Sequence, residues 1–281
     1  MEDIVIVVTG ATGNVGRALV ELLTAGGEQV TAVSRGSATV PAGARHVRAD
    51  LGDPASLRPA LESARALFLL VAGDDPEGVL SRAADSGVRR VVLLSSQGAG
   101  TRPESYHHPA RFEEAARGSG LEWTTLRPGG FHTNALAWAE GIHAERTVAA
   151  PFPDVGLPSI DPADIAEVAA TVLRENDYED GNDHAGRTYE LTGGVPLTPR
   201  ERAAAIGEAL GEPVRFVEQT REEARARMLR FMPEPVVDGT LAVLGEPTAA
   251  ELKVSPDVEL ILGRAPRTFA DWAGLNVAAF R

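Results

Sequence analysis

The sequence contains no cysteine among its 281 residues, and Lys253 is its only lysine. The missing thiols exclude disulfides, a thiolate nucleophile and metal sites with cysteine ligands. No apolar run is long enough to cross a bilayer, and the Met1–Asp3 start lacks the basic residues of a secretory signal, so a cytoplasmic location is expected. Basic residues number 27 against 40 acidic ones, and this net charge of -13 argues against binding nucleic acid or an acidic membrane surface.

The composition that remains is that of an ordinary globular protein, with 43% apolar and 24% charged residues. The first half of the chain alternates strand-like and helix-like segments. Strands are predicted at 4–8, 29–34, 45–48, 66–72, 91–95 and 121–126, and helices after the 10–16 turn, from 53–54, at 77–86 and at 110–117. This alternation predicts right-handed βαβ crossovers, and therefore a doubly wound parallel α/β sheet of the Rossmann type.

The regular alternation of strand-like and helix-like segments ends after Arg127. Helices are expected at 134–145, 163–173, 199–210 and 220–228, strands at 188–192 and 214–218, and a polar loop at 176–187. We interpret these elements as a small C-terminal α/β substrate lobe. The predicted dinucleotide-binding core is 1–130, with 159–175 returning to it, and the predicted substrate lobe is 131–158 together with 176–281.

The segment Thr9–Gly16, TGATGNVG, is the strongest motif, because it follows a buried strand and opens a helix. Gly10 permits a tight turn, Gly13 lets the backbone approach a pyrophosphate, and Gly16 lets the helix pack on the strand. The first N–H groups of such a helix attract phosphate. The predicted phosphate-binding residues are Gly10, Thr12, Gly13, Asn14, Val15 and Gly16.

Arg35 directly follows the second predicted strand, at the position that faces the adenosine ribose in this fold. An acidic residue there would hold a ribose 2′-hydroxyl, whereas an arginine suits a 2′-phosphate, and no Asp or Glu occurs between Gln29 and Arg48. NADP(H) is therefore favoured over NAD(H). Asp50 and Leu51 either contact the adenine or belong to a helix-capping turn, and the sequence leaves both interpretations open.

The glycines of the motif follow the spacing G-x-x-G-x-x-G. Together with the segments Phe112–Leu136, Ser159–Leu173, Tyr189–Thr198 and Pro266–Ala273, this spacing resembles the NmrA-like atypical short-chain dehydrogenases over most of the chain. The resemblance implies a Rossmann core with a small substrate lobe. It also implies one of the functions found in that family, which includes quinone reductases, other NAD(P)H-dependent reductases, tailoring enzymes and non-catalytic nucleotide sensors.

By position, the same resemblance distributes further residues around the cofactor. It implies an adenosine side flanked by Val71, Ala72 and Gly73, a nicotinamide ribose near Ser95 and Ser96, and a nicotinamide beside Pro128, Gly129, Gly130 and Phe131.

The chain departs from the family pattern at the catalytic pair. Active short-chain dehydrogenases usually carry a tyrosine and, four residues later, a lysine that lowers the pKa of the phenol. Tyr106 lies in roughly the corresponding region, but Ala110 stands four residues on. Tyr106, His108 and His132 are the remaining candidates for a proton donor. An exposed pair ahead of a helix is the alternative interpretation of His107 and His108.

Glu113 and Glu114 are expected in the first turn of that helix, where carboxylates stabilise the helix dipole. Candidates for lining a substrate pocket are mostly aromatic, and ordinary packing explains the aromatic ones equally well. They are Gln97, Phe131, Asn134, Trp138, Phe152 and Phe231. No spacing typical of a metal site is present.

The leading hypothesis is an NAD(P)H-dependent oxidoreductase that transfers hydride to a quinone-like, conjugated or aromatic polyketide-type small molecule. Such substrates spread the negative charge that an ordinary ketone concentrates on one oxygen, so they need no strong acid. One alternative is a non-catalytic NAD(P)-sensing regulator. Another is a secondary-metabolite tailoring enzyme that oxygenates a reduced aromatic substrate. A homodimer is left open.

Overall fold

The computed structural model describes residues 5–174 and 184–281. Ile4 of the first predicted strand and residues 176–183 of the predicted polar loop lie outside the described residues. The chain forms two compact units, which are described separately. The first unit consists of Met1–Gly100, His107–Pro128 and Pro162–Glu190, and the second of Thr101–Tyr106, Gly129–Asp161 and Leu191–Arg281.

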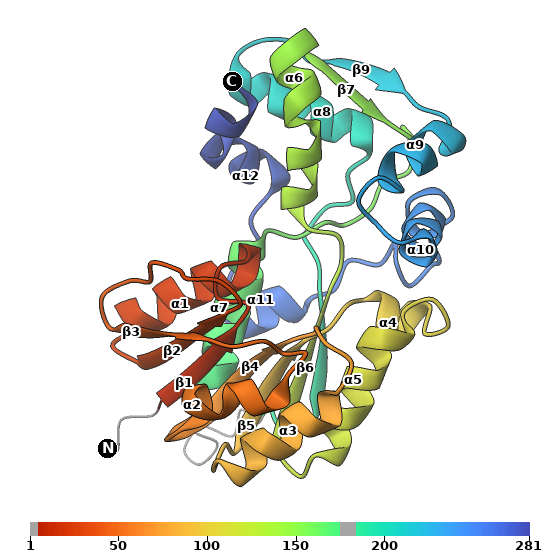
Figure 1. Cartoon of the computed structure of the whole chain (residues 1–281). Coiled ribbons are helices and arrows are strands. Elements are labelled where there is room, and N and C mark those ends of the chain that lie inside the picture. Colours follow the sequence, from red (N-terminus) through yellow and green to blue (C-terminus); the bar gives the residue numbers. More distant parts are fainter. Residues whose placement is uncertain (1–4, 175–183) are drawn as a thin grey trace. The chain divides into compact units, whose positions relative to one another are not determined.

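The first unit is built on a seven-stranded sheet in the order β3-β2-β1-β4-β5-β6-β8 (Figure 1). Its strands are β1 (Val5–Thr9), β2 (Gln29–Ser34), β3 (Ala44–Arg48), β4 (Ala64–Leu70), β5 (Arg90–Leu94), β6 (Glu122–Pro128) and β8 (Arg187–Leu191). β1 to β6 pair in parallel, and Val7 of β1 faces Thr31 on one side and Leu67 on the other. The strand order reverses between β1 and β4, where this fold binds dinucleotides. The predicted Rossmann-type α/β class is confirmed.

Helices cover both faces of this sheet (Figure 1). On one face α1 (Asn14–Ala25) packs against α7 (Pro162–Arg174), which also contacts β4, β5 and β6. The other face carries η1 (Pro54–Leu57), α2 (Arg58–Leu61), α3 (Pro76–Asp85) and α5 (His107–Gly118), and a short helix α4 (Gly98–Thr101) follows β5.

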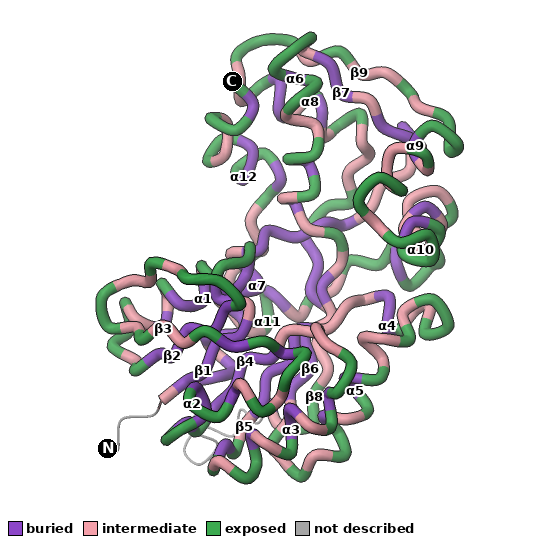
Figure 2. The backbone as a smooth tube through the Cα atoms, viewed as in Figure 1, coloured by how far each residue is buried: buried purple, intermediate pink, exposed green. Residues whose placement is uncertain are grey.

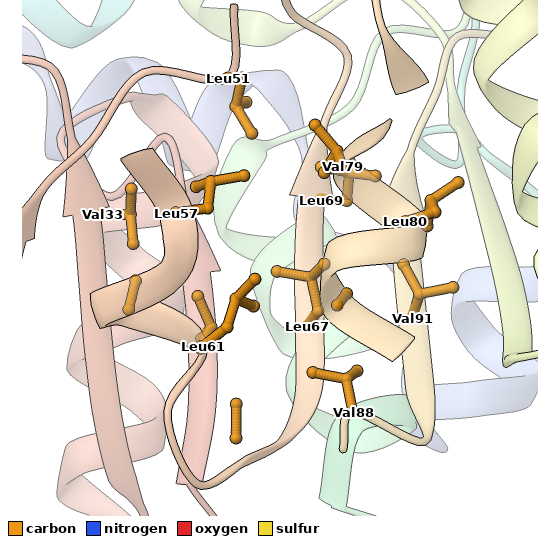
Figure 3. Close-up of a cluster of buried hydrophobic side chains, with 14 of the residues drawn as sticks. Val33, Leu51, Leu57, Leu61, Leu67, Leu69, Val79, Leu80, Val88 and Val91 are labelled. Carbon is orange, nitrogen blue, oxygen red and sulfur yellow. The ribbon is translucent and has the colours of Figure 1, made fainter. Parts of the chain in front are cut away.

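The core on the α2–α3 side follows from the two-residue period of the strands. Leu67 and Leu69 of β4 point to the same face and meet Leu57 of η1 and Leu80 of α3, all fully buried (Figure 3). The central strands are buried along most of their length (Figure 2). Strands buried on both faces explain the unbroken apolar runs in the sequence.

The second unit contains mostly helices. Its elements are η2 (His132–Trp138), α6 (Ala139–Glu145), β7 (Thr147–Ala150), α8 (Pro199–Leu210), β9 (Arg215–Glu218), α9 (Arg221–Met228), α10 (Glu234–Gly245), α11 (Asp257–Leu262), α12 (Phe269–Leu275) and η3 (Val277–Phe280). β7 and β9 pair in parallel. A core of Ile142, Val148, Ile206, Trp272 and Phe280 holds α6, β7, α8, α12 and η3 together.

Two expectations for this region need correction. The helix predicted at 134–145 begins as the 3₁₀-helix η2, which no side chain caps, and becomes α-helical only at Ala139. The elements β7, α10, α11 and α12 were not predicted, because β7 has only four residues and α10 begins in a Pro-rich segment with Gly239 inside it. Within the described ranges, no helix is both long and apolar enough to cross a membrane.

Candidate cofactor and active site

The glycine motif forms the turn between β1 and α1. Gly10 has a φ of +62°, in the left-handed region that favours glycine. A Cβ on Gly16 would lie 2.2 Å from the carbonyl oxygen of Gly10, and one on Gly13 would lie 3.3 Å from the same oxygen. The turn therefore leaves no room for a side chain at Gly16 and little room at Gly13.

The first turn of α1 fits a phosphate group. Gly13 is the N-cap residue, and no side chain caps the helix there. α1 has no acidic residue in its first turn. The N–H groups of this turn and the positive end of the helix dipole therefore form a cradle for an anion such as a pyrophosphate.

The segment after β2 presents basic groups. The Arg35 side chain is exposed, and the Nε of Arg48 donates to the Arg35 carbonyl oxygen at 2.9 Å. The hydroxyl of Ser34 donates to the carbonyl oxygen of Gly36 at 2.8 Å, so the Nε2 of His46, 2.9 Å away, donates to that hydroxyl. This network fixes the backbone of the turn and leaves the Arg35 guanidinium to face solvent.

The segments after β3 and β4 lie against each other. Gly73 has a φ of +78°, and a Cβ there would lie 2.6 Å from the carbonyl oxygen of Leu51. Asp50 accepts a hydrogen bond from the Gly52 N–H at 2.9 Å, and Asp53 accepts one from the Ala55 N–H at 3.1 Å. The capping-turn interpretation of the Asp50–Leu51 segment is therefore confirmed, while its contact with the adenine stays a prediction.

His108 contacts the segment that follows β4. The helix α5 begins at His107, so the histidine pair forms its first turn rather than a loop ahead of it. The Nε2 of His108 lies 2.7 Å from the Gly73 carbonyl oxygen and donates to it, because a carbonyl only accepts. Val71, Ala72 and Gly73 form the start of the segment that this hydrogen bond holds.

The carboxyl end of β5 carries Ser95, Ser96 and Gln97. The backbone N–H groups of Ser95 and Gln97 donate to Leu126 and Pro128 of β6 at 2.8 and 2.9 Å. The Oγ of Ser96 accepts from the Gly98 N–H at 3.2 Å. The two neighbouring strand ends therefore form one backbone platform, from which the Pro128–Phe131 segment continues.

The position of Glu113 differs from the one predicted from the sequence. The structure places it in the second turn of α5, 1% exposed, and not in a first turn that stabilises the helix dipole. Its carboxylate accepts hydrogen bonds from Arg127, Arg117 and Ser95. Burial by itself raises the pKa of Glu113, but these hydrogen bonds and the two guanidinium charges outweigh burial and lower it. Its partner Arg127 is 14 positions away, so no local pattern signals the pair.

Tyr106 and His132 belong to the second unit. Burial and the charge of Glu251 raise the pKa of the Tyr106 phenol, the opposite of what a lysine partner does. His132 is buried, with Nδ1 2.9 Å from the Ser159 Oγ and its ring edge-on to Phe269. Their roles as proton donors stay predictions.

The candidate substrate residues of the second unit lie in different surroundings. Phe131 pairs with Ile160 in a parallel bridge, and Asn134 is exposed. Trp138 packs on the core and borders a hollow of about 360 Å³. Phe152 adopts a φ of +54° and packs in a small cluster with α9 and α10, whereas Phe231 is 70% exposed. Gln97 lies in the first unit, and the assignment of these residues to a substrate pocket stays a prediction.

The fold and the glycine turn define a Rossmann-type dinucleotide-binding protein. Residues 10–176 match the family model described as NAD(P)H-binding. The chain is 36% identical to a (4-alkanoyl-5-oxo-2,5-dihydrofuran-3-yl)methyl phosphate reductase of Streptomyces griseus, over 98% of this chain and 99% of the relative. It is 32% identical to an NAD(P)H azoreductase of Xenophilus azovorans, over 98% and 99%.

The fold is also similar to that of a solved structure. An NADPH-dependent quinone oxidoreductase of Escherichia coli, complexed with NADPH, superposes with a TM-score of 0.79 at 24% identity, covering 97% of this chain and 99% of that one. The chain therefore belongs to the NAD(P)H-binding family, and the predicted likeness to NmrA-like atypical short-chain dehydrogenases is confirmed. It is an NAD(P)H-dependent oxidoreductase. Among the described residues, no group of His, Asp and Glu side chains is arranged to hold a metal ion.

Proposed function

We propose that this chain reduces conjugated carbonyl compounds, such as quinones and unsaturated lactones, with NADPH as the hydride donor. The observation that carries the proposal is the environment of Tyr106. Its phenol has a raised pKa, Ala110 occupies the position four residues on, and the only lysine is the exposed Lys253. A substrate that needs strong acid assistance is poorly served by such a site, whereas a conjugated acceptor delocalises the charge that it gains.

The relatives support this substrate class. The name of the Streptomyces griseus reductase describes a dihydrofuranone ring whose carbon–carbon double bond is activated by the ring carbonyl and by the alkanoyl group. The Escherichia coli enzyme is named for quinones. Both kinds of substrate accept hydride at a position conjugated to a carbonyl, and the proton that completes the reduction can come from solvent.

The residues of the first unit would bind and orient the cofactor. The turn Gly10–Gly16 and the first turn of α1 would hold the pyrophosphate. The backbone platform at Ser95–Gln97 would support the nicotinamide half, and His108 would fix the segment at Gly73 on the adenosine side. The cofactor, when bound, supplies the hydride, and the protein supplies position.

We propose NADPH over NADH on the basis of Arg35. Its guanidinium faces solvent directly after β2, and the stretch from Gln29 to Arg48 holds no carboxylate to bind a ribose 2′-hydroxyl. The second unit would bind the small-molecule substrate, with Phe131 and Trp138 among its apolar contacts.

Oxidation of NADPH tests the function directly. Absorbance would be followed with a panel of quinones, unsaturated lactones and enones, and with matched saturated ketones. Turnover is expected with the conjugated compounds and at least tenfold less with the ketones, about 1.4 kcal/mol in the barrier. Equal rates with simple ketones would overturn the substrate class. Tight NADPH binding without turnover on any compound would favour a nucleotide sensor, and an oxygen-dependent product would favour the tailoring enzyme.

Cofactor preference is tested with Arg35→Gln. The expected result is a dissociation constant for NADPH raised about tenfold and one for NADH changed less than twofold, because a charge-assisted hydrogen bond to phosphate is lost. Arg58→Gln is the matched control, since Arg58 is an exposed arginine of the same unit at the start of α2. An equal loss of affinity for both cofactors would contradict the assignment.

A further inference from the structure

Glu113 lies at the centre of a buried polar network in the first unit. The Ser95 hydroxyl donates to Oε1 of Glu113 at 2.6 Å. Arg127 binds the same carboxylate through two nitrogens, with Nε 2.9 Å from Oε1 and Nη2 2.7 Å from Oε2, and Arg117 adds a contact of 2.8 Å to Oε2. Four donors therefore saturate this carboxylate, which is 1% exposed.

The surrounding backbone is shaped to accommodate Arg127. Its Nη1 reaches Glu190 at 3.3 Å. A Cβ on Gly100 would lie 2.3 Å from the same nitrogen, so a larger residue there would displace the guanidinium. The network thus links the residue after β5 to α5, β6 and β8. The four hydrogen bonds to the Glu113 carboxylate offset the cost of burying it beside Arg127.

The position of this network in the fold gives it a functional meaning. Ser95 directly follows β5, on the half of the sheet that binds the nicotinamide side of a dinucleotide. Because its single hydroxyl proton goes to Glu113, Ser95 has only lone pairs to offer a ligand. Ser96 accepts from the Gly98 N–H, and its own proton has no acceptor within residues 5–174 and 184–281. The two adjacent serines are therefore not equivalent.

We propose that Glu113 and Arg127 are positioning residues that act through Ser95 to hold the Ser95–Gln97 turn for the nicotinamide half of the cofactor. This inference rests on one part of the proposed function, the binding of NADPH by the first unit. Ser96 is then the serine that donates a hydrogen bond to a ligand. Ser95 anchors the turn through its hydrogen bond to Glu113. A carboxylate locked by two guanidinium groups is a rigid support, because no rotamer change is possible without breaking several charge-assisted hydrogen bonds.

The test compares Ser95→Ala with Ser95→Thr in the whole chain. The alanine removes the hydroxyl and the threonine keeps it, so a positioning role requires them to differ. NADPH affinity would be measured by fluorescence titration, alongside kcat, KM and the melting temperature. We expect Ser95→Ala to weaken NADPH binding about tenfold and to lower the melting temperature by about a few degrees, because the buried Glu113 carboxylate loses one of its four donors. Ser95→Thr should bind within about twofold of the unaltered chain. Ser81→Ala, on the exposed side of α3, is the matched control.

A second comparison uses Glu113→Gln. If Glu113 acts through Ser95, the Ser95→Ala and Glu113→Gln changes are not additive, and the double variant binds NADPH like Glu113→Gln alone. The inference is overturned if Ser95→Ala binds NADPH as the unaltered chain does, if alanine and threonine weaken binding equally, or if the two effects add. NADPH binding without turnover by the unaltered chain would remove the proposed function and leave this inference intact, whereas no NADPH binding would overturn both.

Discussion

The Nε2 of His108 donates a hydrogen bond to the carbonyl oxygen of Gly73 across 2.7 Å. The bond joins the first turn of α5 to the segment after β4. It also commits the proton that a catalytic histidine would have to give away. His108 is half-exposed, and its ring lies edge-on to Phe112 at 5.2 Å. These contacts suit a residue that fixes a cofactor-binding segment.

His108→Ala should therefore raise the KM for NADPH about five- to tenfold and change kcat less than about threefold, because a hydrogen bond that orders a loop is lost. Steady-state kinetics at saturating substrate would measure both constants. His107→Ala is the control, since His107 is the exposed neighbour in the same turn. A collapse of kcat with an unchanged KM would instead identify His108 as the proton donor.

Gly16→Ala should abolish tight NADPH binding, with a dissociation constant raised at least about a hundredfold. Its Cβ would lie 2.2 Å from the Gly10 carbonyl oxygen, so the turn must open or α1 must shift. Gly118→Ala is the contrasting change, because nothing lies within 4 Å of a Cβ there and Gly118 is the last residue of α5. Fluorescence titration would measure these dissociation constants. Normal NADPH binding by Gly16→Ala would show that the turn does not require glycine at position 16.

Two buried threonines of the sheet give opposite predictions. Thr9 donates to the Phe68 carbonyl oxygen at 2.9 Å and accepts from the Leu70 N–H at 2.8 Å. Thr9→Val should cost about 1–3 kcal/mol of unfolding free energy, because two buried backbone groups lose a partner. The hydroxyl of Thr125 is buried with no hydrogen-bond partner in the described part of the chain, so Thr125→Val should be neutral or stabilising by about 1 kcal/mol. Urea unfolding measures the free energy of unfolding of both variants. Equal losses in the two variants would show that the hydrogen bonds of Thr9 do not stabilise the fold.

Glu251 should make the second unit sensitive to acid. Its buried carboxylate accepts from Arg102 Nε at 2.8 Å and from Thr101 Oγ1 at 2.9 Å. Burial by itself raises the pKa of Glu251, but the hydrogen bonds from Arg102, the Thr248 backbone and Thr101 prevail and lower it from 4.5 to about 2.

Because the folded-state pKa lies below the unfolded one, the stabilisation is complete above pH 4.5 and is lost as the pH falls toward 2. Urea midpoints between pH 2.5 and 7 should fall more steeply for the unaltered chain than for Glu251→Gln. Glu246→Gln, which removes an 84% exposed carboxylate, should keep the steep dependence. If the urea midpoint depended on pH equally in all three proteins, Glu251 would not be the cause of the acid sensitivity.

Local signals explain what could be predicted from the sequence. The sequence predicts α8 from Pro199 to Leu210, because Thr198 and Pro199 are typical of a helix start and Gly211 follows the last residue. The structure adds that Glu201 completes a capping box with Thr198 and that Gly211 is in the left-handed conformation. The turn at Gly10 could be predicted equally well, since the contacts that require glycine at Gly13 and Gly16 are made with Gly10 and Ala11. These contacts and the ends of α8 depend only on neighbours in the sequence, whereas a Cβ on Gly10 would lie 2.9 Å from the side chain of Leu70 in β4.

Long-range pairs could not be predicted in the same way. Nothing near Glu113 indicates that Arg127 will neutralise it, and the helix dipole offered a sufficient local explanation. His108 and Tyr106 are two positions apart, yet they belong to different units, because the chain changes unit between Tyr106 and His107. Their closeness in the sequence therefore suggests a shared catalytic role, although the two side chains lie in different surroundings.

That change of unit is one of five. The chain passes from one unit to the other after Gly100, Tyr106, Pro128, Asp161 and Glu190. Neither unit is a continuous stretch of gene, so a single recombination event cannot transplant the second unit onto another nucleotide-binding core. An engineer who wished to exchange the second unit would have to replace three separate segments at once, whereas point substitutions and loop insertions can change it within an intact chain.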